Sequence, residues 1–333
     1  MVECSSQMQE YFDSLQKRFS EALEICKEAR EENLDPSQEV EIAPAPDVAA
    51  RVEGLVGPVG VAARVRELSK GKKREMVSFE IAREIVEQKF LSDEEKQEHF
   101  SLEFQQLLLE QAIRTGLALF TEGVVSAPIE GVSRVEVRKN FDGSSYAAVF
   151  FSGPIRGAGG TGQAFTLLLA DYCRRLLKIG DFRALEDHVE RYVEELALYA
   201  RKTRAGQYVP SDDEVRHVVR SCAVCIEGEP TEDYEVSKYK NVEGVSTSRV
   251  RGGVCLVLSE GLCLKASKVL KISKKAGLDW TWIEKLIKVS KKDAEKVSIR
   301  PVSKYIDEIV AGRPIFSYPM RPGGFRLRYG RTR

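Results

Sequence analysis

The hydrophobic periodicity of this 333-residue chain changes near Gly131, and that change limits the fold more than any other feature of the sequence. Before it, apolar residues recur every three or four positions, which is the period of an α-helix with one buried face. After it, Val135 and Val137 alternate with charged residues, and the turn sequence Asn140–Gly143 leads into an apolar run at 146–151, as in a β-hairpin. The sequence therefore predicts an α+β fold, in which a helical region precedes an α+β domain.

The same patterns predict how the chain is divided. We expect an amphipathic helix with a proline-rich linker over 1–46, a helical domain over 47–130, an α+β domain over 131–300, and an arginine- and aromatic-rich segment over 301–333 that leads into further protein. Helices are predicted over 7–32, 47–55, 59–68, 78–90, 92–120, 161–178, 184–202, 211–220, 260–276 and 281–289. Further strands are predicted over 222–227, 242–249 and 253–258.

The charge of the chain is balanced, with 51 basic and 51 acidic residues, so no global field attracts a nucleic acid or an anionic membrane. A site for a polyanion must therefore be local. No run of 18 apolar residues occurs, and the first residues have neither the basic nor the apolar region of a signal peptide. These features predict a cytoplasmic protein without a membrane partner.

Seven cysteines are scattered along the chain, an odd number that predicts reduced thiols and no disulfide framework. Cys222 and Cys225 form a C-x-x-C pair, but no second pair and no nearby histidine pair completes four zinc ligands. We expect both thiols to be buried like small apolar side chains, and we expect this chain to bind no metal ion or cofactor.

A glycine-rich segment, Gly153–Gly162, follows a predicted strand, opens a predicted helix and satisfies the pattern G-x-G-x-x-G. In a dinucleotide-binding fold that helix leads to a second parallel strand with an acidic residue about 20 positions on, whereas here another helical pattern follows. Two interpretations remain: the helix start binds a phosphate, or the glycines allow a tight turn that packs against the sheet. The phosphate interpretation assigns contacts to Arg156, Gly157, Gly159, Gly160 and Thr161.

Two other arginine-rich segments are candidates for contacts with anions. Arg249 and Arg251 stand beside hydroxyl residues and a Gly-Gly pair that lets a ligand approach the backbone, although arginines at a strand end are often only solvated. In the last part of the chain, aromatic residues are interleaved with arginines, a mixture suited to phosphate contacts and base stacking, or to docking on an acidic surface. The candidate residues of this segment are Arg321, Arg326, Arg328 and Arg331.

Four motifs in this order resemble those of one family: Gly153-Pro154-Ile155-Arg156-x-Ala158-Gly159-Gly160-Thr161, Gly228-Glu229-Pro230-Thr231, Arg251-Gly252-Gly253 and Pro322-Gly323-Gly324-Phe325-Arg326-Leu327-Arg328-Tyr329-Gly330-Arg331. Over essentially its whole length, the chain is similar to the N-terminal portion of the large subunit of the archaeal family D DNA polymerases.

The resemblance implies a replicative DNA-directed DNA polymerase whose large subunit holds the polymerase centre and whose small subunit is a 3′–5′ exonuclease. In that family the catalytic aspartates, which work with Mg²⁺, and cysteine-rich zinc modules lie in a later segment of the large subunit. The resemblance therefore implies that no residue of this chain is catalytic, that residues 301–333 lead into the catalytic region, and that the chain alone is inactive. It also implies a KH-like α+β domain, with the small subunit, DNA and other replication proteins as partners.

Two other functions fit the residues taken alone. One is a stand-alone enzyme that binds a nucleotide or another phosphate at Gly153–Gly162. The other is a protein-interaction module whose first helix binds the small subunit or another replication protein. Nucleotide binding by the chain alone would favour the first, and binding that does not weaken with salt would favour the second.

Overall fold

The computed structural model describes residues 5–34, 45–97, 100–122, 126–203, 207–287, 314–316 and 325–327. The chain forms two units, Met1–Ile287 and Lys288–Arg333, each of which is described by itself. In the second unit the described residues are two short strands, β4 (Pro314–Phe316) and β5 (Phe325–Leu327), which pair antiparallel. The rest of the predicted arginine-rich segment lies outside the described residues.

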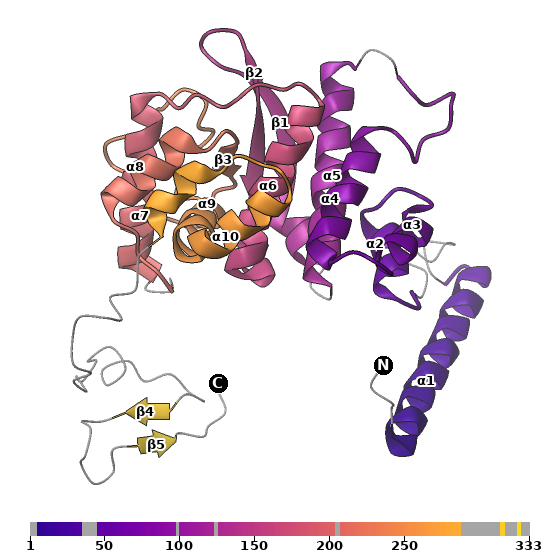
Figure 1. Ribbon diagram of the computed structural model, residues 1–333. Coiled ribbons are helices and arrows are strands. Elements are labelled where there is room, and N and C mark those ends of the chain that lie inside the picture. Colours follow the sequence, from indigo (N-terminus) through magenta and orange to yellow (C-terminus); the bar gives the residue numbers. More distant parts are fainter. Residues whose placement is uncertain are drawn as a thin grey trace. The chain divides into compact units, whose positions relative to one another are not determined.

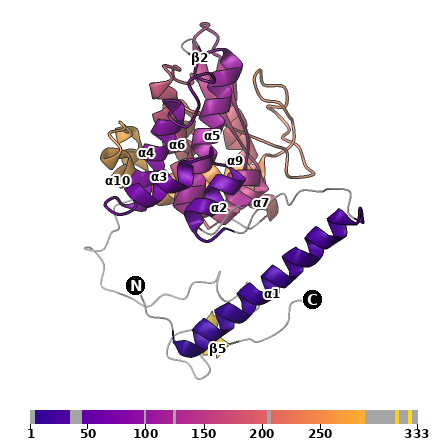
Figure 2. The same ribbon diagram turned by 90° about the vertical axis from the view of Figure 1, so that its right-hand side faces the viewer.

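The first unit is mainly helical (Figures 1 and 2). Its α-helices are α1 (Ser6–Glu31), α2 (Val48–Leu55), α3 (Val61–Leu68), α4 (Arg74–Val86), α5 (Leu102–Thr121), α6 (Gly159–Leu176), α7 (Glu186–Thr203), α8 (Asp212–Ser221), α9 (Gly252–Leu256) and α10 (Leu264–Lys275). Short π- or 3₁₀-helical segments occupy Ala127–Gly131, Gly153–Ala158, Val257–Cys263 and Thr281–Leu286. Among the described helices, none is long and apolar enough to cross a membrane.

Three strands form a small mixed sheet in the order β1 (Val132–Lys139), β2 (Ser145–Phe151) and β3 (Cys225–Gly228). β1 and β2 are antiparallel and form the hairpin that the alternating pattern predicts, whereas β2 and β3 are parallel. The hairpin turn contains Gly143 at a φ of +82°, a left-handed conformation that glycine adopts without strain. The α+β fold class is therefore confirmed.

The outer edge of β1 is covered by side chains of α5. The carboxylate of Glu110 accepts a hydrogen bond from the backbone N–H of Val135 at 3.0 Å, and Gln106 accepts one from Val137 at 2.8 Å. Arg114 donates to the carbonyl oxygen of Val132 at 2.9 Å. These contacts satisfy backbone groups that an edge strand otherwise leaves unpaired, and they fix the helical region to the sheet.

One hydrophobic core runs through the first unit, from Ala49 on α2 to Leu286. It crosses residue 130, because Phe120 of α5 stacks on Phe165 of α6 with ring centroids 4.2 Å apart. The predicted helical and α+β regions thus pack against each other around shared apolar side chains. Their division into separate domains remains a prediction.

Several predicted elements differ from the structure. The predicted strand 253–258 is helical, comprising α9 and part of Val257–Cys263, because a run that is buried on every side shows no period that distinguishes a strand from a helix. The predicted strand 242–249 is irregular, apart from one isolated bridge. The helix predicted to begin at Ser92 begins at Leu102 instead; Ser92 does bond to Glu95, but the two residues close only a turn.

Helix α1 has an apolar face that is exposed. Its first turn is capped by Ser5, whose hydroxyl accepts a hydrogen bond from the N–H of Met8. No residue of α1 is buried. Large apolar side chains that lie exposed on it are Met8, Tyr11, Phe12, Leu15, Phe19 and Ile25.

Candidate nucleic-acid interface

The glycine-rich segment joins the end of β2 to the start of α6. Residues Gly153–Ala158 form a 3₁₀-helical segment, and α6 begins at Gly159, whose φ of +64° favours glycine. A Cβ atom on Gly160 would lie less than 3.0 Å from the carbonyl oxygen of Glu260, and one on Gly162 would lie 2.8 Å from the Cβ of Ala158. Gly159, Gly160 and Gly162 therefore each have a structural reason to be glycine, as the tight-turn interpretation requires.

The same segment leaves a cation and a helix start open to solvent. Arg156, Gly157 and Gly159 are exposed, and Thr161 is partly exposed. The Nη2 atom of Arg156 donates to the hydroxyl of Tyr199 on α7 at 3.2 Å, and within the described part of the chain Arg156 forms no ion pair with a carboxylate. The N–H of Gly159 already donates to the carbonyl oxygen of Arg156, but the guanidinium of Arg156 lies unneutralised beside the positive end of the α6 dipole. A cation beside a helix N-terminus is an arrangement that attracts a phosphate.

The described chain does not follow the order of a dinucleotide-binding unit, against which the sequence analysis argued. After α6 the chain continues into α7 and α8, and β3, the parallel neighbour of β2, follows only after these three helices.

Arg251 lies inside the protein. Its side chain has no exposed surface, and it forms ion pairs with Glu195 of α7 at 2.7 Å and with Glu227 of β3. Burial alone would lower the pKa of Arg251, but the two carboxylates outweigh burial and raise this pKa well above its usual value. The anion contact predicted at Arg251 does not fit this geometry, because the chain's own carboxylates occupy the guanidinium and the core covers it.

Arg249 is nearer the surface but is also engaged. Its Nη2 atom pairs with Asp233 at 2.6 Å, and its Nε donates to the carbonyl oxygen of Glu232 at 2.8 Å. Both partners belong to the acidic stretch 227–235 that precedes Arg249 in the chain. The side chain of Arg249 remains 41% exposed, so it differs from Arg251 in being accessible to solvent.

The structure locates the remaining candidates only in part. Arg326 lies on β5, and its backbone lies opposite that of Ile315 in β4. Arg321, Arg328 and Arg331 lie outside the described residues. The contacts predicted for these four arginines remain predictions.

The thiols of Cys222 and Cys225 are buried, as predicted. Burial raises the pKa of Cys222 to about 12 and the pKa of Cys225 further still, so both thiols stay protonated. Across the described ranges, no group of three or more histidine, cysteine or acidic side chains converges in a way that could hold a metal ion.

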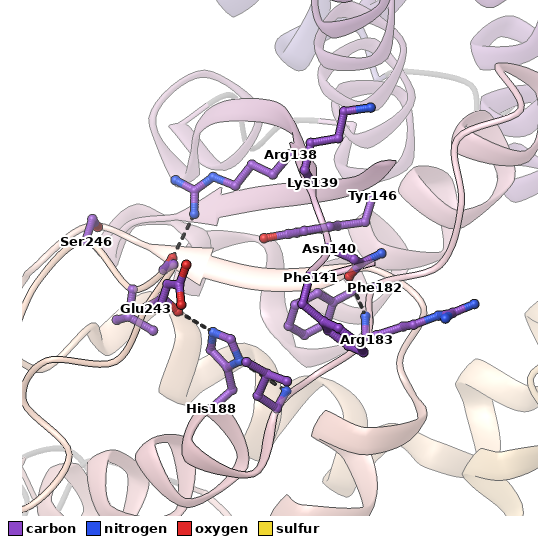
Figure 3. Close-up of a pocket in the computed structure, with 13 residues that line it drawn as sticks. Arg138, Lys139, Asn140, Phe141, Tyr146, Phe182, Arg183, His188, Glu243 and Ser246 are labelled. Atoms are coloured by element: carbon purple, nitrogen blue, oxygen red, sulfur yellow. Dashed lines mark hydrogen bonds between the residues drawn. The ribbon is translucent and has the colours of Figure 1, made fainter. Parts of the chain in front are cut away.

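The structure reveals one further surface that the sequence analysis did not identify. A cavity of about 600 Å³ opens at the turn of the β1–β2 hairpin, and its lining includes basic and aromatic side chains and the acidic Glu243 (Figure 3). The signal in the sequence was a phenylalanine, Phe141, at the tip of a predicted hairpin, two residues after Lys139. An apolar ring at a turn has no buried position to occupy, and its exposure could have been inferred from the hairpin itself.

Comparisons with known proteins agree with the resemblance. Residues 10–289 match the family model described as DNA polymerase II large subunit DP2, N-terminal, and residues 291–333 match the central domain of the same subunit. The DNA polymerase II large subunit of Methanosarcina barkeri is 48% identical over 99% of this chain, and that of Pyrococcus furiosus is 42% identical over 100% of it. The chain spans 28% of the length of each of these two relatives. By these matches, the chain belongs to the family of the archaeal DNA polymerase II large subunit.

Proposed function

We propose that this chain supplies the non-catalytic N-terminal part of the large subunit of a replicative archaeal DNA-directed DNA polymerase, where it provides scaffold, DNA contacts and subunit contacts. The observation that carries the proposal is the match over the whole chain to proteins named DNA polymerase II large subunit. Nucleotidyl transfer uses metal ions held by converging carboxylates, and the described residues contain no such group. In this proposal Mg²⁺, its carboxylates and the zinc modules belong to other parts of the large subunit.

The proposed DNA contact is the exposed surface at the start of α6. Arg156 carries a full positive charge there, its only described partner is a neutral phenol, and Thr161 adds a hydroxyl donor. Burial raises the pKa of Tyr199, so the phenol stays neutral and leaves the charge of Arg156 available to a phosphate. Packing explains why Gly160 and Gly162 are glycine, but it does not explain an unpaired arginine at the helix start.

The proposal is tested by measuring the affinity of the chain for primer–template DNA over a range of salt concentrations. Arg156→Ala is expected to weaken binding by roughly 1–3 kcal/mol, the range for a charge-assisted hydrogen bond, without lowering the melting temperature. It should also reduce the magnitude of the slope of log K against log salt by about 0.7–0.9. Arg66→Ala is the matched control, because Arg66 is an exposed arginine that already pairs with Asp47 on the helical side of the unit. Unchanged affinity in Arg156→Ala would remove the glycine-rich segment from the DNA interface.

The arginines at 321, 326, 328 and 331 are proposed to add further phosphate contacts, with the neighbouring aromatic side chains stacking on bases. A chain that lacks residues 313–333 should then lose several units of the salt slope in the same experiment. The full 333-residue chain, supplied with Mg²⁺ and no partner, is expected not to extend a primer, and extension would overturn the non-catalytic assignment.

The proposed protein partner is the small, exonuclease-bearing subunit, with other replication proteins as further partners, and α1 is the proposed contact. Met8, Phe12, Leu15 and Phe19 are separated by four, three and four residues, the spacing of a helix–helix seam, and all four are exposed. We also propose that the α+β region is KH-like and that the protein is cytoplasmic. The small sheet packed against helices supports the KH-like assignment.

A further inference from the structure

The cavity at the hairpin turn is built from the β1–β2 hairpin and two segments that are distant from it in the sequence. Its walls are the turn around Asn140, the start of β2 at Tyr146, the segment 182–188 and the loop 243–246 (Figure 3). Its volume of about 600 Å³ lies within the range of roughly 300–1,000 Å³ that is typical of small-molecule sites. The cavity is therefore large enough for one nucleotide.

Buried and shared hydrogen bonds hold these walls in place. The buried side chain of Asn140 accepts from the N–H of Arg183 at 3.0 Å and donates to the carbonyl oxygen of Asp181 at 2.9 Å. Arg138 donates to the carbonyl oxygen of Gly244 at 2.8 Å, which ties β1 to the opposite loop. The cavity is thus a preformed feature of the fold, and a ligand need not order it on binding.

His188 fixes the same loop from α7. Its Nδ1 atom accepts from the N–H of Leu185 at 3.2 Å, so its Nε2 atom carries the proton and donates to the carbonyl oxygen of Glu243 at 2.6 Å. Both ring nitrogens are therefore occupied by backbone groups. His188 is part of the frame of the cavity and not a group available to a ligand.

Three aromatic rings contribute to the cavity. Tyr146 and Phe182 lie against each other with ring centroids 4.9 Å apart and are mostly buried. Phe141, at the hairpin tip, is 73% exposed, an unfavourable position for an apolar ring unless a flat partner covers it. Burial raises the pKa of Tyr146 to about 12, so its hydroxyl keeps its proton and remains a hydrogen-bond donor.

The cations around the cavity differ in their availability. Arg138 pairs with Glu136 at 2.6 Å and is largely covered, so its charge is neutralised within the protein. Arg183 pairs with Asp142, but its side chain remains 59% exposed. Lys139 is exposed, but its side chain extends away from the cavity (Figure 3). An anionic group at the rim would therefore meet Arg183, while the carboxylate of Glu243 stands on another wall of the same cavity.

We propose that this cavity binds one nucleotide of single-stranded DNA, with the base stacked on Phe141 and the phosphate at Arg183. A flat ring beside an exposed cation matches the two halves of a nucleotide, and base–aromatic stacking is how single strands are held without sequence preference. A base within a duplex is paired and stacked on both faces, so it cannot enter. That the nucleotide belongs to DNA rests on the proposed function; the stacking and charge geometry do not depend on Arg156.

The test compares three ligands on the full chain by fluorescence anisotropy and competition: a labelled oligothymidylate of about 12 nucleotides, a duplex of the same length, and free thymidine monophosphate. Phe141→Ala is expected to weaken single-strand binding by roughly 5- to 150-fold, the range for the loss of one stacked base, and to leave duplex binding unchanged. Phe141→Tyr keeps a ring and should restore single-strand affinity. Because Phe141 is exposed, equal melting temperatures are expected for all these variants.

Arg183→Ala should lower the magnitude of the single-strand salt slope by about 0.7, with Lys178→Ala, at an exposed turn outside the cavity, as the control. Unchanged single-strand affinity in Phe141→Ala would overturn the proposal, as would equal losses for single strand and duplex. Free thymidine monophosphate that binds as tightly as the oligonucleotide would make the cavity a mononucleotide site and also overturn it. If Arg156→Ala still weakens primer–template binding in those cases, the proposed function stands without the cavity.

Discussion

The glycine-rich segment at 153–162 and the arginine segment at 247–253 look alike in sequence and differ in the folded protein. Each combines arginine, hydroxyl residues and closely spaced glycines, and each was a candidate for binding an anion. Arg156 of the first is exposed beside a neutral phenol, whereas Arg251 of the second is enclosed between two carboxylates. The sequence motif therefore does not determine whether an arginine is available to a ligand. This depends on which side chain the fold places beside the guanidinium.

One helix supplies both partners. Glu195 on α7 binds Arg251, and Tyr199, one turn further along α7, binds Arg156. The neighbouring carboxylate of Glu194 accepts hydrogen bonds from the backbone N–H groups of Ser237 and Tyr239. The backbone N–H groups of residues 237–239 and the guanidinium groups of Arg249 and Arg251 are thus bound by the chain's own carboxylates. Among the described residues, no carboxylate binds Arg156 in this way.

The largest expected effect is on the enclosed arginine. Arg251→Met should lower the free energy of unfolding by about 3–5 kcal/mol, because it leaves Glu195 and Glu227 as buried charges without their main partner. Urea denaturation measures this loss. Arg249→Met, at the exposed ion pair with Asp233, should change the free energy of unfolding by less than about 1 kcal/mol. Equal stability of the two variants would contradict the claim that Arg251 stabilises the fold whereas Arg249 is solvated.

The sequence predicted the hairpin and most helices because their periods of two and about 3.6 are visible in the pattern. It did not predict α9, because Val254 and Leu256 belong to a run that is buried on every side. Nor could it predict that Arg251 is buried in an ion pair, because its partner Glu195 lies 56 residues away in the sequence. Arg156 was identified correctly as a residue beside a helix start, since that relationship is local in the chain.

The glycines of the first segment provide the second test. Gly160→Ala should lower the free energy of unfolding by about 1–3 kcal/mol, because its Cβ would collide with the carbonyl oxygen of Glu260. Gly159→Ala should lower it by about 1 kcal/mol, because its φ is positive although the space around it is open. Gly153→Ala is the control, since it has neither a close neighbour nor a positive φ. Thermal unfolding followed by circular dichroism separates the three.

The DNA affinity of Gly160→Ala also shows whether Gly160 is needed for packing alone or for DNA binding as well. If this variant keeps its affinity for DNA once its lower stability is taken into account, Gly160 serves only the packing of α6 against Val257–Cys263. A Gly153→Ala variant as unstable as Gly160→Ala would show that the contact with Glu260 is not the cause.

The smallest expected effect is the pH dependence of the stability that Glu194 contributes, by binding the backbone of residues 237–239. Burial alone would raise the pKa of Glu194, but hydrogen bonds from the N–H groups of Lys238, Tyr239 and Ser237 outweigh it and lower the pKa below the usual 4.5. A carboxyl group whose pKa is lower in the folded state stabilises the fold above its unfolded pKa, and this contribution disappears as the pH falls through the folded pKa. Glu194→Gln should therefore be less stable than the wild type at pH 7, by on the order of 1 kcal/mol, and the difference should shrink below about pH 4.5. Urea denaturation at pH 7 and pH 3 measures it, with the exposed Glu94→Gln as control. A difference that is the same at both values would mean that the charge of Glu194 does not contribute to holding residues 237–239 in place.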